Sequence, residues 1–331
     1  MKNNVANPKI NLKDMLSKSI SGSGGGIIIA FCLLIVILSI ASPHFMTVSN
    51  ITIIIRQAVF VAIIGFGMTF VIGMGGIDLS VGATMSICGL VAADLILKGQ
   101  NIFFAILVAL IIGTFIGFIN GLLISKVGIA DFITTLAIMS ILRGIIMVYS
   151  KGMPIYGLRF PELQYLAQGF IGPVPVPVLL TVISMILCYY LMYRTKFGRY
   201  TLSIGSNSEA ARLVGINITK IKILVYSLTG LLAAIAGVLL TSRLEAAMPE
   251  AGMGYELDVI AATVIGGTSL SGGKASLIGT AVGAVLMAVV RNGLNLLNIN
   301  VFWHQVVIGS IILIAVGIDR FSSINLKNGL N

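Results

Sequence analysis

Long apolar runs recur along the whole 331-residue chain, and they constrain its fold more than any other feature. A helix needs about 20 mainly apolar residues to cross a bilayer. With 57% hydrophobic and 10% charged residues, against about 25% charged in a soluble domain, the chain cannot cover itself with polar surface. We therefore expect an all-α integral membrane protein of about ten transmembrane helices, some short or broken. The expected segments are 25–41, 51–73, 80–97, 102–125, 130–149, 177–193, 221–242, 257–268, 275–296 and 301–318.

The distribution of Lys and Arg predicts the orientation, because short cytoplasmic loops retain basic residues. If the N-terminus is inside, fourteen of the 21 Lys and Arg lie on the inner side, five lie on the outer side, and Arg56 and Arg143 fall inside spans. The five outer residues are Lys98, Lys151, Arg159, Arg243 and Arg291. We expect a multi-pass protein of the cell membrane with both termini cytoplasmic. Its parts would be a segment 1–23, a transmembrane domain 24–320 with a cytoplasmic loop 194–222, and a tail 321–331.

Two glycine-rich stretches share the pattern G-G-x-x-L-S-x-G, one at Gly75–Gly82 and one at Gly266–Gly273. Each interrupts an apolar run, and paired interruptions of this kind are typical of the broken helices of transport folds. Broken backbone at membrane depth must face protein or a wet cavity. The stretches therefore either form part of a path through the bundle or are glycine-rich cytoplasmic turns. Asp78 can cap the following helix or act as a polar group of the path.

Glycines four residues apart predict close helix packing, since they let two backbones approach each other. The pairs are Gly113 and Gly117, Gly117 and Gly121, and Gly279 and Gly283. In the loop 194–222, Ser206 and Glu209 have capping-box spacing, and Gly215 suits the left-handed position that ends a helix. So short a helix needs support from the bundle or from a partner protein.

Several motifs stand in order between about Pro43 and Asp319, together with the spacing Glu209-Ala210-Ala211-x-x-x-Gly215. They resemble the ribose, xylose and galactoside permease group of ATP-binding-cassette importers, and within that group ribose-type permeases. The motifs are Gly67-Met68-Thr69-Phe70-Val71-Ile72, Gly76-Ile77-Asp78-Leu79-Ser80-Val81-Gly82, Gly198-Arg199-Tyr200, Gly254-Tyr255-Glu256-Leu257-Asp258, Ile265-Gly266-Gly267-Thr268-Ser269-Leu270 and Asn292-Gly293-Leu294.

The resemblance implies a homodimer of permeases that forms one path, an extracytoplasmic sugar-binding protein that delivers the cargo, and a cytoplasmic ATPase that drives import. ATP and Mg would be bound by that ATPase, and no cofactor by this chain. The residues that would couple the permease to the ATPase are Glu209, Ala210, Ala211, Arg212 and Gly215. Met74 and Ala83 depart from the group's pattern, and Met74 lies beside the expected path, so the sugar stays open.

A neutral sugar requires hydrogen-bonding and aromatic groups rather than ions, and we expect these groups in the breaks and their neighbours. Each candidate also has an ordinary interpretation as a cap or packing residue. The candidates are Phe66, Phe70, Asp78, Ser80, Thr268, Ser269, Ser271, Asn292 and Asn295. Near the outer mouth, Glu245, Glu250 and Glu256 either contact basic groups of the binding protein or belong to a solvated loop. With Asp258 they lie in a stretch that has few balancing basic residues.

Other functions fit the sequence less well. A secondary transporter driven by an ion gradient would need carboxylates embedded in the membrane, and Asp78 is the only acid near a break. A permease for another small polar cargo, such as a nucleoside or a furanose signal, fits the same motifs. The residues up to Lys274 lack the first glycine and the final Ser or Thr of a phosphate loop. The dispersed Lys and Arg also do not resemble a nucleic-acid patch, and Cys32, Cys88 and Cys188 form no C-x-x-C pair.

Overall fold

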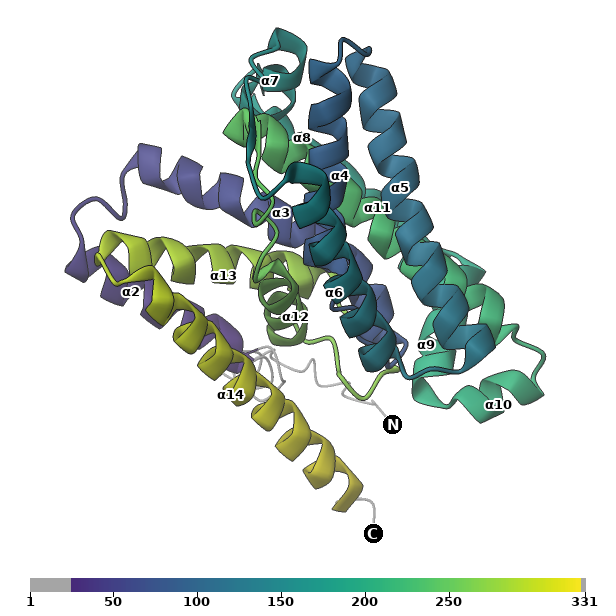
Figure 1. The fold of residues 1–331 in the computed structure, drawn as a ribbon. Helices are drawn as coiled ribbons and strands as arrows, with labels where there is room; N and C mark the ends of the chain where they lie inside the picture. The colour runs from purple at the N-terminus through teal and green to yellow at the C-terminus, as the bar shows by residue number, and fades with distance from the viewer. Residues whose placement is uncertain (1–24, 329–331) are drawn as a thin grey trace, which may run out of the picture.

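The computed structural model describes the backbone of residues 25–328 and the side chains of residues 31–317, and its described part is almost entirely helical (Figure 1). The helices are α2 Gly25–Ala41, α3 Val48–Gly73, α4 Val81–Leu97, α5 Ile102–Leu122, the π-helix η1 Leu123–Val127, α6 Asp131–Ser150, α7 Pro161–Gln168, α8 Val176–Arg194, α9 Lys196–Ser206, α10 Ser208–Leu213, α11 Ile218–Leu244, α12 Tyr255–Ile265, α13 Leu277–Leu296 and α14 Val301–Asn328. Each of the ten predicted segments coincides with one of these helices.

Six of the helices are long and apolar enough to span a membrane, namely α3, α5 with η1, α6, α8, α11 and α13. Shorter apolar stretches lie in α2, α4 and α14. The predicted class, an all-α integral membrane protein, is confirmed. The helix α14 continues to Asn328, well past the predicted end of the last span at 318. The predicted N-terminal segment 1–23 and residues 329–331 lie outside the described residues.

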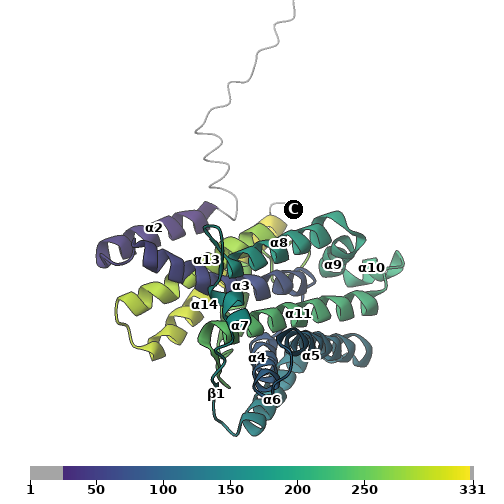
Figure 2. The same cartoon turned by 90° about the horizontal axis from the view of Figure 1, so that it is seen from above.

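The helices α3, α11 and α13 form the interior of the bundle. In the most apolar 18-residue stretch of each of these helices, 67% is buried inside the bundle, whereas in α5, α6 and α8 the buried share is 22–28%. The last three therefore turn most of their apolar side chains outward, where lipid or another protein replaces water as their surroundings. Figure 2 shows α11 between α3 on one side and α4 and α5 on the other, and α11 packs against all three.

The predicted glycine contacts are present. A Cβ atom on Gly117 of α5 would lie 2.1 Å from the carbonyl oxygen of Tyr226 in α11. A Cβ atom on Gly283 of α13 would lie 2.0 Å from the carbonyl oxygen of Ala262 in α12. Real side chains do not fit at such distances, so these glycines allow the α5–α11 and α12–α13 pairs to pack backbone against backbone.

Small elements lie at the two ends of the bundle. At one end, which we call the α7 end, α7 lies beside two short antiparallel ladders. One ladder pairs β1 Ile155–Tyr156 with β4 Ala246–Ala247, and the other pairs β2 Phe170–Ile171 with β3 Val174–Pro175. The opposite end, which we call the α10 end, carries α9 and α10 (Figure 1). The sequence predicted one short helix in the loop 194–222, and the structure has two.

Candidate functional site

The short helix α10 begins one residue later than the predicted capping box requires. Its N-cap is Asn207, whose side-chain oxygen accepts a hydrogen bond from the backbone N–H of Ala210 at 3.0 Å. Ser206 is the last residue of α9, and its hydroxyl donates to the carbonyl of Leu202. The predicted Ser206 cap is therefore wrong, because Ser206 is still part of α9 and Asn207 is the residue that caps α10. The prediction for Gly215 is confirmed, since its φ is +83°.

The helix α10 is attached to the bundle by one buried residue and exposes the rest. Ala211 is buried, while Glu209 and Arg212 are exposed and form an ion pair at 3.0 Å. Leu213 and Val214 are exposed to 86% and 77%. The sequence pattern pointed to the charged residues but not to this apolar pair. Two large apolar side chains beside an ion pair on a protruding helix are typical of a protein contact.

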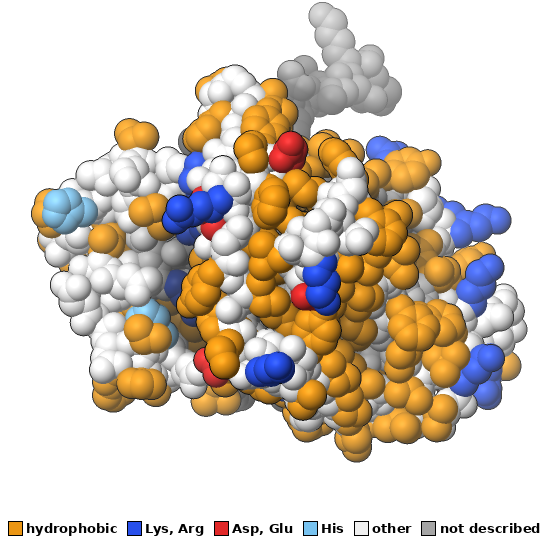
Figure 3. All heavy atoms as spheres, turned by 45° about the horizontal axis from the view of Figure 1, so that its top comes forward, with side chains coloured by type: hydrophobic (Ala, Val, Ile, Leu, Met, Phe, Trp, Pro, Cys, Tyr) orange, Lys and Arg blue, Asp and Glu red, His pale blue; other side chains and the backbone are white. Residues whose placement is uncertain are grey.

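Basic side chains surround α10. Figure 3 shows several of them along the edge of the molecule where α9 and α10 lie. The exposed basic residues of this region are Arg194, Lys196, Arg199, Arg212 and Lys220. The α10 end thus has the basic charge that the sequence predicted for the inner side.

The second glycine break meets the end of α3, just before the first break, at the α10 end and directly against α9. The N–H of Gly273 donates to the carbonyl oxygen of Gly73, at the end of α3, at 2.9 Å. A Cβ atom on Gly205 of α9 would lie 2.1 Å from that oxygen and 2.7 Å from the Gly273 nitrogen. The last turn of α9 therefore packs on the backbone of both segments. Because α10 follows α9 directly, the chain is continuous from α10 to the contacts that α9 makes with the end of α3 and with the second break.

The first break, between α3 and α4, contains a buried polar network. Asp78 accepts hydrogen bonds from the N–H and the hydroxyl of Ser80, at 2.9 and 2.6 Å. The side-chain amide of Asn120, in α5, donates to the Ser80 hydroxyl at 2.8 Å. Asp78 and Ser80 are both 1% exposed. The N-cap of α4 is Ser80 rather than Asp78, so the carboxylate holds the residue that precedes the helix instead of capping it.

The surroundings of this break place it within the bundle. The hydroxyl of Tyr226 lies 3.4 Å from Oδ2 of Asp131 and 3.5 Å from the carbonyl oxygen of Ile77. Tyr226 belongs to the third turn of α11. The chain therefore turns after α3 and runs back into the bundle before α4 begins, as expected for a broken helix enclosed by protein.

The second break, between α12 and α13, is more open. Thr268 is buried, and its hydroxyl oxygen accepts a hydrogen bond from the N–H of Ser276 at 3.1 Å. The N–H of Ser269 donates to the carbonyl of Lys274, which closes a turn. Ser271 is exposed. The polar residues of this break thus hold the turn and its end, and only Ser271 faces outward.

The remaining candidates for the path lie apart from one another. Phe66 and Phe70 are fully buried in α3, and Phe70 stacks on Phe197 with ring centroids 5.5 Å apart. Asn292 exchanges hydrogen bonds with Asn50, at 2.7 and 3.0 Å, and so joins α13 to α3. Asn295 is exposed near the end of α13. The structure brings Asp78 and Ser80 together but does not assemble the whole set into one wall.

Three of the four acids of the stretch 245–258 have basic partners from other elements, contrary to the predicted lack of balancing charge. Glu245 lies 3.5 Å from Arg159 and accepts hydrogen bonds from Gln164 and Gln168 in α7. Glu256 faces Arg143, and Asp258 faces Arg291. Glu250 is exposed. The local charge count could not show these partners, because they belong to α6, α13 and the segment before α7.

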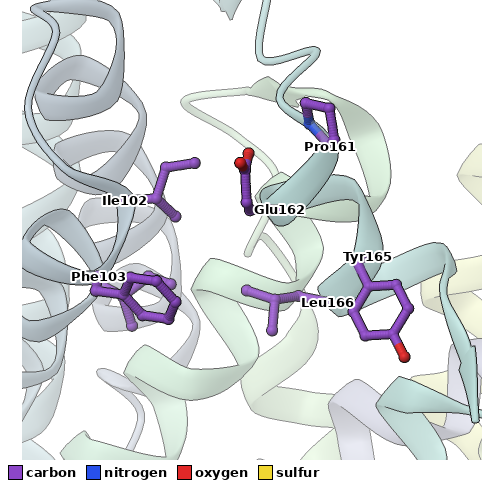
Figure 4. A pocket seen from close by; sticks show the side chains of 7 residues that line it. Ile102, Phe103, Pro161, Glu162, Tyr165 and Leu166 are labelled. Carbon is purple, nitrogen blue, oxygen red and sulfur yellow. The ribbon is translucent and has the colours of Figure 1, made fainter.

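A hollow of about 570 Å³ lies between α5 and α7 at the α7 end (Figure 4). Its lining is apolar except for Glu162, whose carboxylate points into the gap, while the Tyr165 hydroxyl points away from it. Such walls supply few partners for a hydrophilic cargo. Within residues 31–317, no three His, Cys, Asp or Glu side chains are placed to hold a metal ion.

A bundle of apolar helices with two glycine breaks and a short exposed helix at one end is typical of a multi-pass membrane permease. The family model described as the permease component of the branched-chain amino acid transport system matches residues 50–316. The chain belongs to this family of permease components.

Curated relatives are similar over nearly their whole length. The chain is 46% identical to the ribose import permease protein of Bacillus subtilis over 292 residues, which cover 88% of this chain and 91% of the relative. It is 44% identical to the ribose import permease protein of Escherichia coli, with 88% and 92% covered, and 38% identical to the D-allose transport system permease protein of that organism, with 86% and 87% covered. No solved structure matches. The resemblance to ribose-type permeases is confirmed.

Proposed function

We propose that this chain forms the path by which an ATP-driven importer moves a ribose-like monosaccharide across the cell membrane. The observation that carries the proposal is the similarity to ribose import permeases over about nine-tenths of their length. The relatives named for allose and arabinose are less similar, at 35–38% identity. Growth of a deletion strain on a panel of single sugars tests the cargo, and growth defects on nucleosides instead of pentoses would contradict a monosaccharide.

We place α10 on the cytoplasmic side, with both termini, and assign it the contact with a partner ATPase. Its exposed Leu213 and Val214 suit a pocket on that partner, and the Glu209–Arg212 pair sets the polar rim. ATP and Mg belong to the ATPase. ATP binding there would push on α10, and α9 would carry the movement to both glycine breaks.

Two further partners complete the transporter. A second copy of the chain would close the path against the outward-turned helices. An extracytoplasmic binding protein would dock at the α7 end, where the exposed Glu250 and the partly exposed Glu245 offer acidic contacts. No nucleic acid is involved, and lipid covers the remaining apolar surface.

The coupling role is tested in proteoliposomes that contain the complete transporter. Glu209→Lys and Gly215→Pro should leave the protein inserted but reduce the ATP hydrolysis that the loaded binding protein stimulates by roughly tenfold, equivalent to about 1.4 kcal/mol of coupling. Full stimulation in both variants contradicts the assignment. Sugar uptake by the chain without any ATPase, driven by a proton gradient, would instead identify a secondary transporter.

A further inference from the structure

The hollow between α5 and α7 has the size of a ligand site, and no function has yet been given to it. Its volume of about 570 Å³ falls within the range of roughly 300–1,000 Å³ that small-molecule pockets occupy. The helix α7 packs against α8 and α11, and the hollow separates it from α5 (Figure 4). In the lining, Ile102, Phe103 and Ile106 come from α5, and Glu162 and Tyr165 come from α7.

Contacts with α11 hold α7 in place, so the hollow is a fixed feature of this end of the bundle. The Ser242 hydroxyl of α11 donates a hydrogen bond to the carbonyl oxygen of Leu163. The side-chain amide of Gln164 donates to the Glu245 carboxylate at 2.9 Å. Leu163 itself is buried. These contacts turn one face of α7 toward the bundle and leave the face that carries Glu162 beside the hollow.

The hollow lies where a membrane-spanning helix begins. Asn101 caps α5, because its side-chain oxygen accepts a hydrogen bond from the N–H of Phe103 at 2.9 Å. The residues before Phe103, from Gln100 to Asn101, are polar and exposed, whereas the helix that follows is apolar enough to span a membrane. Headgroups meet hydrocarbon near the start of such a helix. Tyr165, whose hydroxyl points away from the hollow, is a residue type enriched at that boundary.

An exposed apolar stripe continues from the hollow along α5. Phe103, Leu107, Ile111 and Phe115 follow one another at intervals of four residues, which places them on one face of the helix. They are exposed to 75%, 54%, 57% and 58%. The stripe is about 18 Å long at 1.5 Å per residue, and the hydrocarbon of one leaflet is about 15 Å thick. The stripe therefore matches an acyl chain that starts at the hollow and runs toward the middle of the membrane.

The charge in the hollow indicates the headgroup of such a lipid. The Glu162 carboxylate points into the gap (Figure 4), and the ion pairs within residues 31–317 do not include it. A carboxylate only accepts hydrogen bonds, so it favours a cation that carries N–H donors. A primary ammonium group has three such donors, a quaternary ammonium has none, and an anionic headgroup would be repelled.

We propose that the hollow binds a phospholipid with a primary amine headgroup, of the phosphatidylethanolamine type, from the leaflet at the α7 end. Its ammonium group meets Glu162, and one acyl chain lies along the stripe that begins at Phe103. The site adds a lipid to the transporter and does not depend on which cargo is carried.

The test uses the complete transporter in phosphatidylcholine vesicles, whose quaternary headgroup competes weakly for the carboxylate. A trace of phosphatidylethanolamine or phosphatidylglycerol is added, each with the same photoactivatable diazirine on one acyl chain. After irradiation, mass spectrometry of the peptides gives the labelling ratio of the two lipids on α5 and α7. Labelling of α6, whose Ile145 and Val148 are exposed to 48% and 81%, gives the reference ratio for lipid that is not held at the hollow.

The wild-type ratio on α5 and α7 should exceed the α6 ratio about fivefold in favour of phosphatidylethanolamine, as expected for a partly exposed ion pair. Glu162→Gln should reduce it to the α6 ratio. Glu250→Gln, which removes an exposed acid outside the hollow, is the matched control and should leave the ratio unchanged. If Glu162→Gln fails to insert, Ile106→Trp, which fills the hollow, should give the same reduction.

Three results would overturn the proposal. A wild-type ratio on α5 and α7 equal to that on α6 would show that the hollow does not select an amine. An unchanged ratio in Glu162→Gln would show that the carboxylate does not hold the lipid. Absence of labelling on α5 and α7 with either lipid would show that protein, such as a second copy of the chain, covers the hollow.

Discussion

The two glycine breaks carry the same eight-residue pattern but lie in opposite surroundings. In the first, Asp78 and Ser80 are almost fully buried and bonded to each other and to Asn120. In the second, Ser271, which corresponds to Ser80, is exposed. The difference arises because Asn120 of α5 and Tyr226 of α11 contact the first break, whereas Ser271 of the second break lies at the surface. The shared motif therefore marks a turn of the chain at both breaks. Whether the polar groups of a break are buried depends on the helices that pack around it.

The comparison also shows where the two breaks act together. The second break contacts the end of α3, two residues before the first break, through the Gly73–Gly273 hydrogen bond, and Gly205 of α9 lies against both glycines. One helix thus contacts the open break and the residue that leads into the buried one.

The largest effect is expected from Gly205→Ala. Its new Cβ would meet backbone atoms of both breaks, which cannot move aside as a flexible side chain would. We expect a loss of about 3 kcal/mol in the free energy of unfolding, at the upper end for overpacking, together with loss of sugar uptake. The measurement is denaturant unfolding of the purified protein in detergent, beside uptake in proteoliposomes.

Gly309→Ala is the matched control, since nothing lies within 4 Å of the corresponding Cβ in α14. It should unfold like the wild type. If Gly205→Ala also unfolds like the wild type and transports normally, the two breaks are not held together through α9.

A smaller effect is expected at the buried break from Asp78→Ala. The substitution leaves the N–H and hydroxyl of Ser80 without their acceptor, at a cost of about 2 kcal/mol in the free energy of unfolding. Asp78→Asn keeps an oxygen acceptor and should retain most of the stability. Thermal unfolding in detergent distinguishes the two. Equal destabilisation by both substitutions would show that the negative charge, rather than the acceptor oxygen, holds this break.

The smallest effect is expected at the open break. Thr268→Val removes the acceptor for the Ser276 N–H and should cost about 1 kcal/mol in the free energy of unfolding. Ser271→Ala, at the exposed position, should change it by less than about 0.5 kcal/mol. Both are measured by the same unfolding assay. A large loss for Ser271→Ala would mean that this break is enclosed in the assembled transporter, and the contrast between the two breaks would then disappear.

Several features of the candidate site could be read from the sequence because they are local. The helix-ending Gly215 follows from neighbours within one turn, and the glycine pairs follow from helical spacing. The capping residue of α10 was missed because the sequence does not show where α9 ends. The partners of Glu256 and Asp258 were missed for a different reason. Arg143 and Arg291 are distant in the sequence, and only the packing of α6 and α13 against α12 brings them close.

The sequence by itself determined that the protein is a helical membrane bundle, because apolar runs of this length can satisfy their backbone hydrogen bonds in lipid only as helices. It also determined the approximate helix positions and the family. Only the tertiary structure decided which polar groups are enclosed and which charges are paired. Those properties depend on contacts between helices, and the residues next to a given residue in the sequence do not specify which helix packs against it.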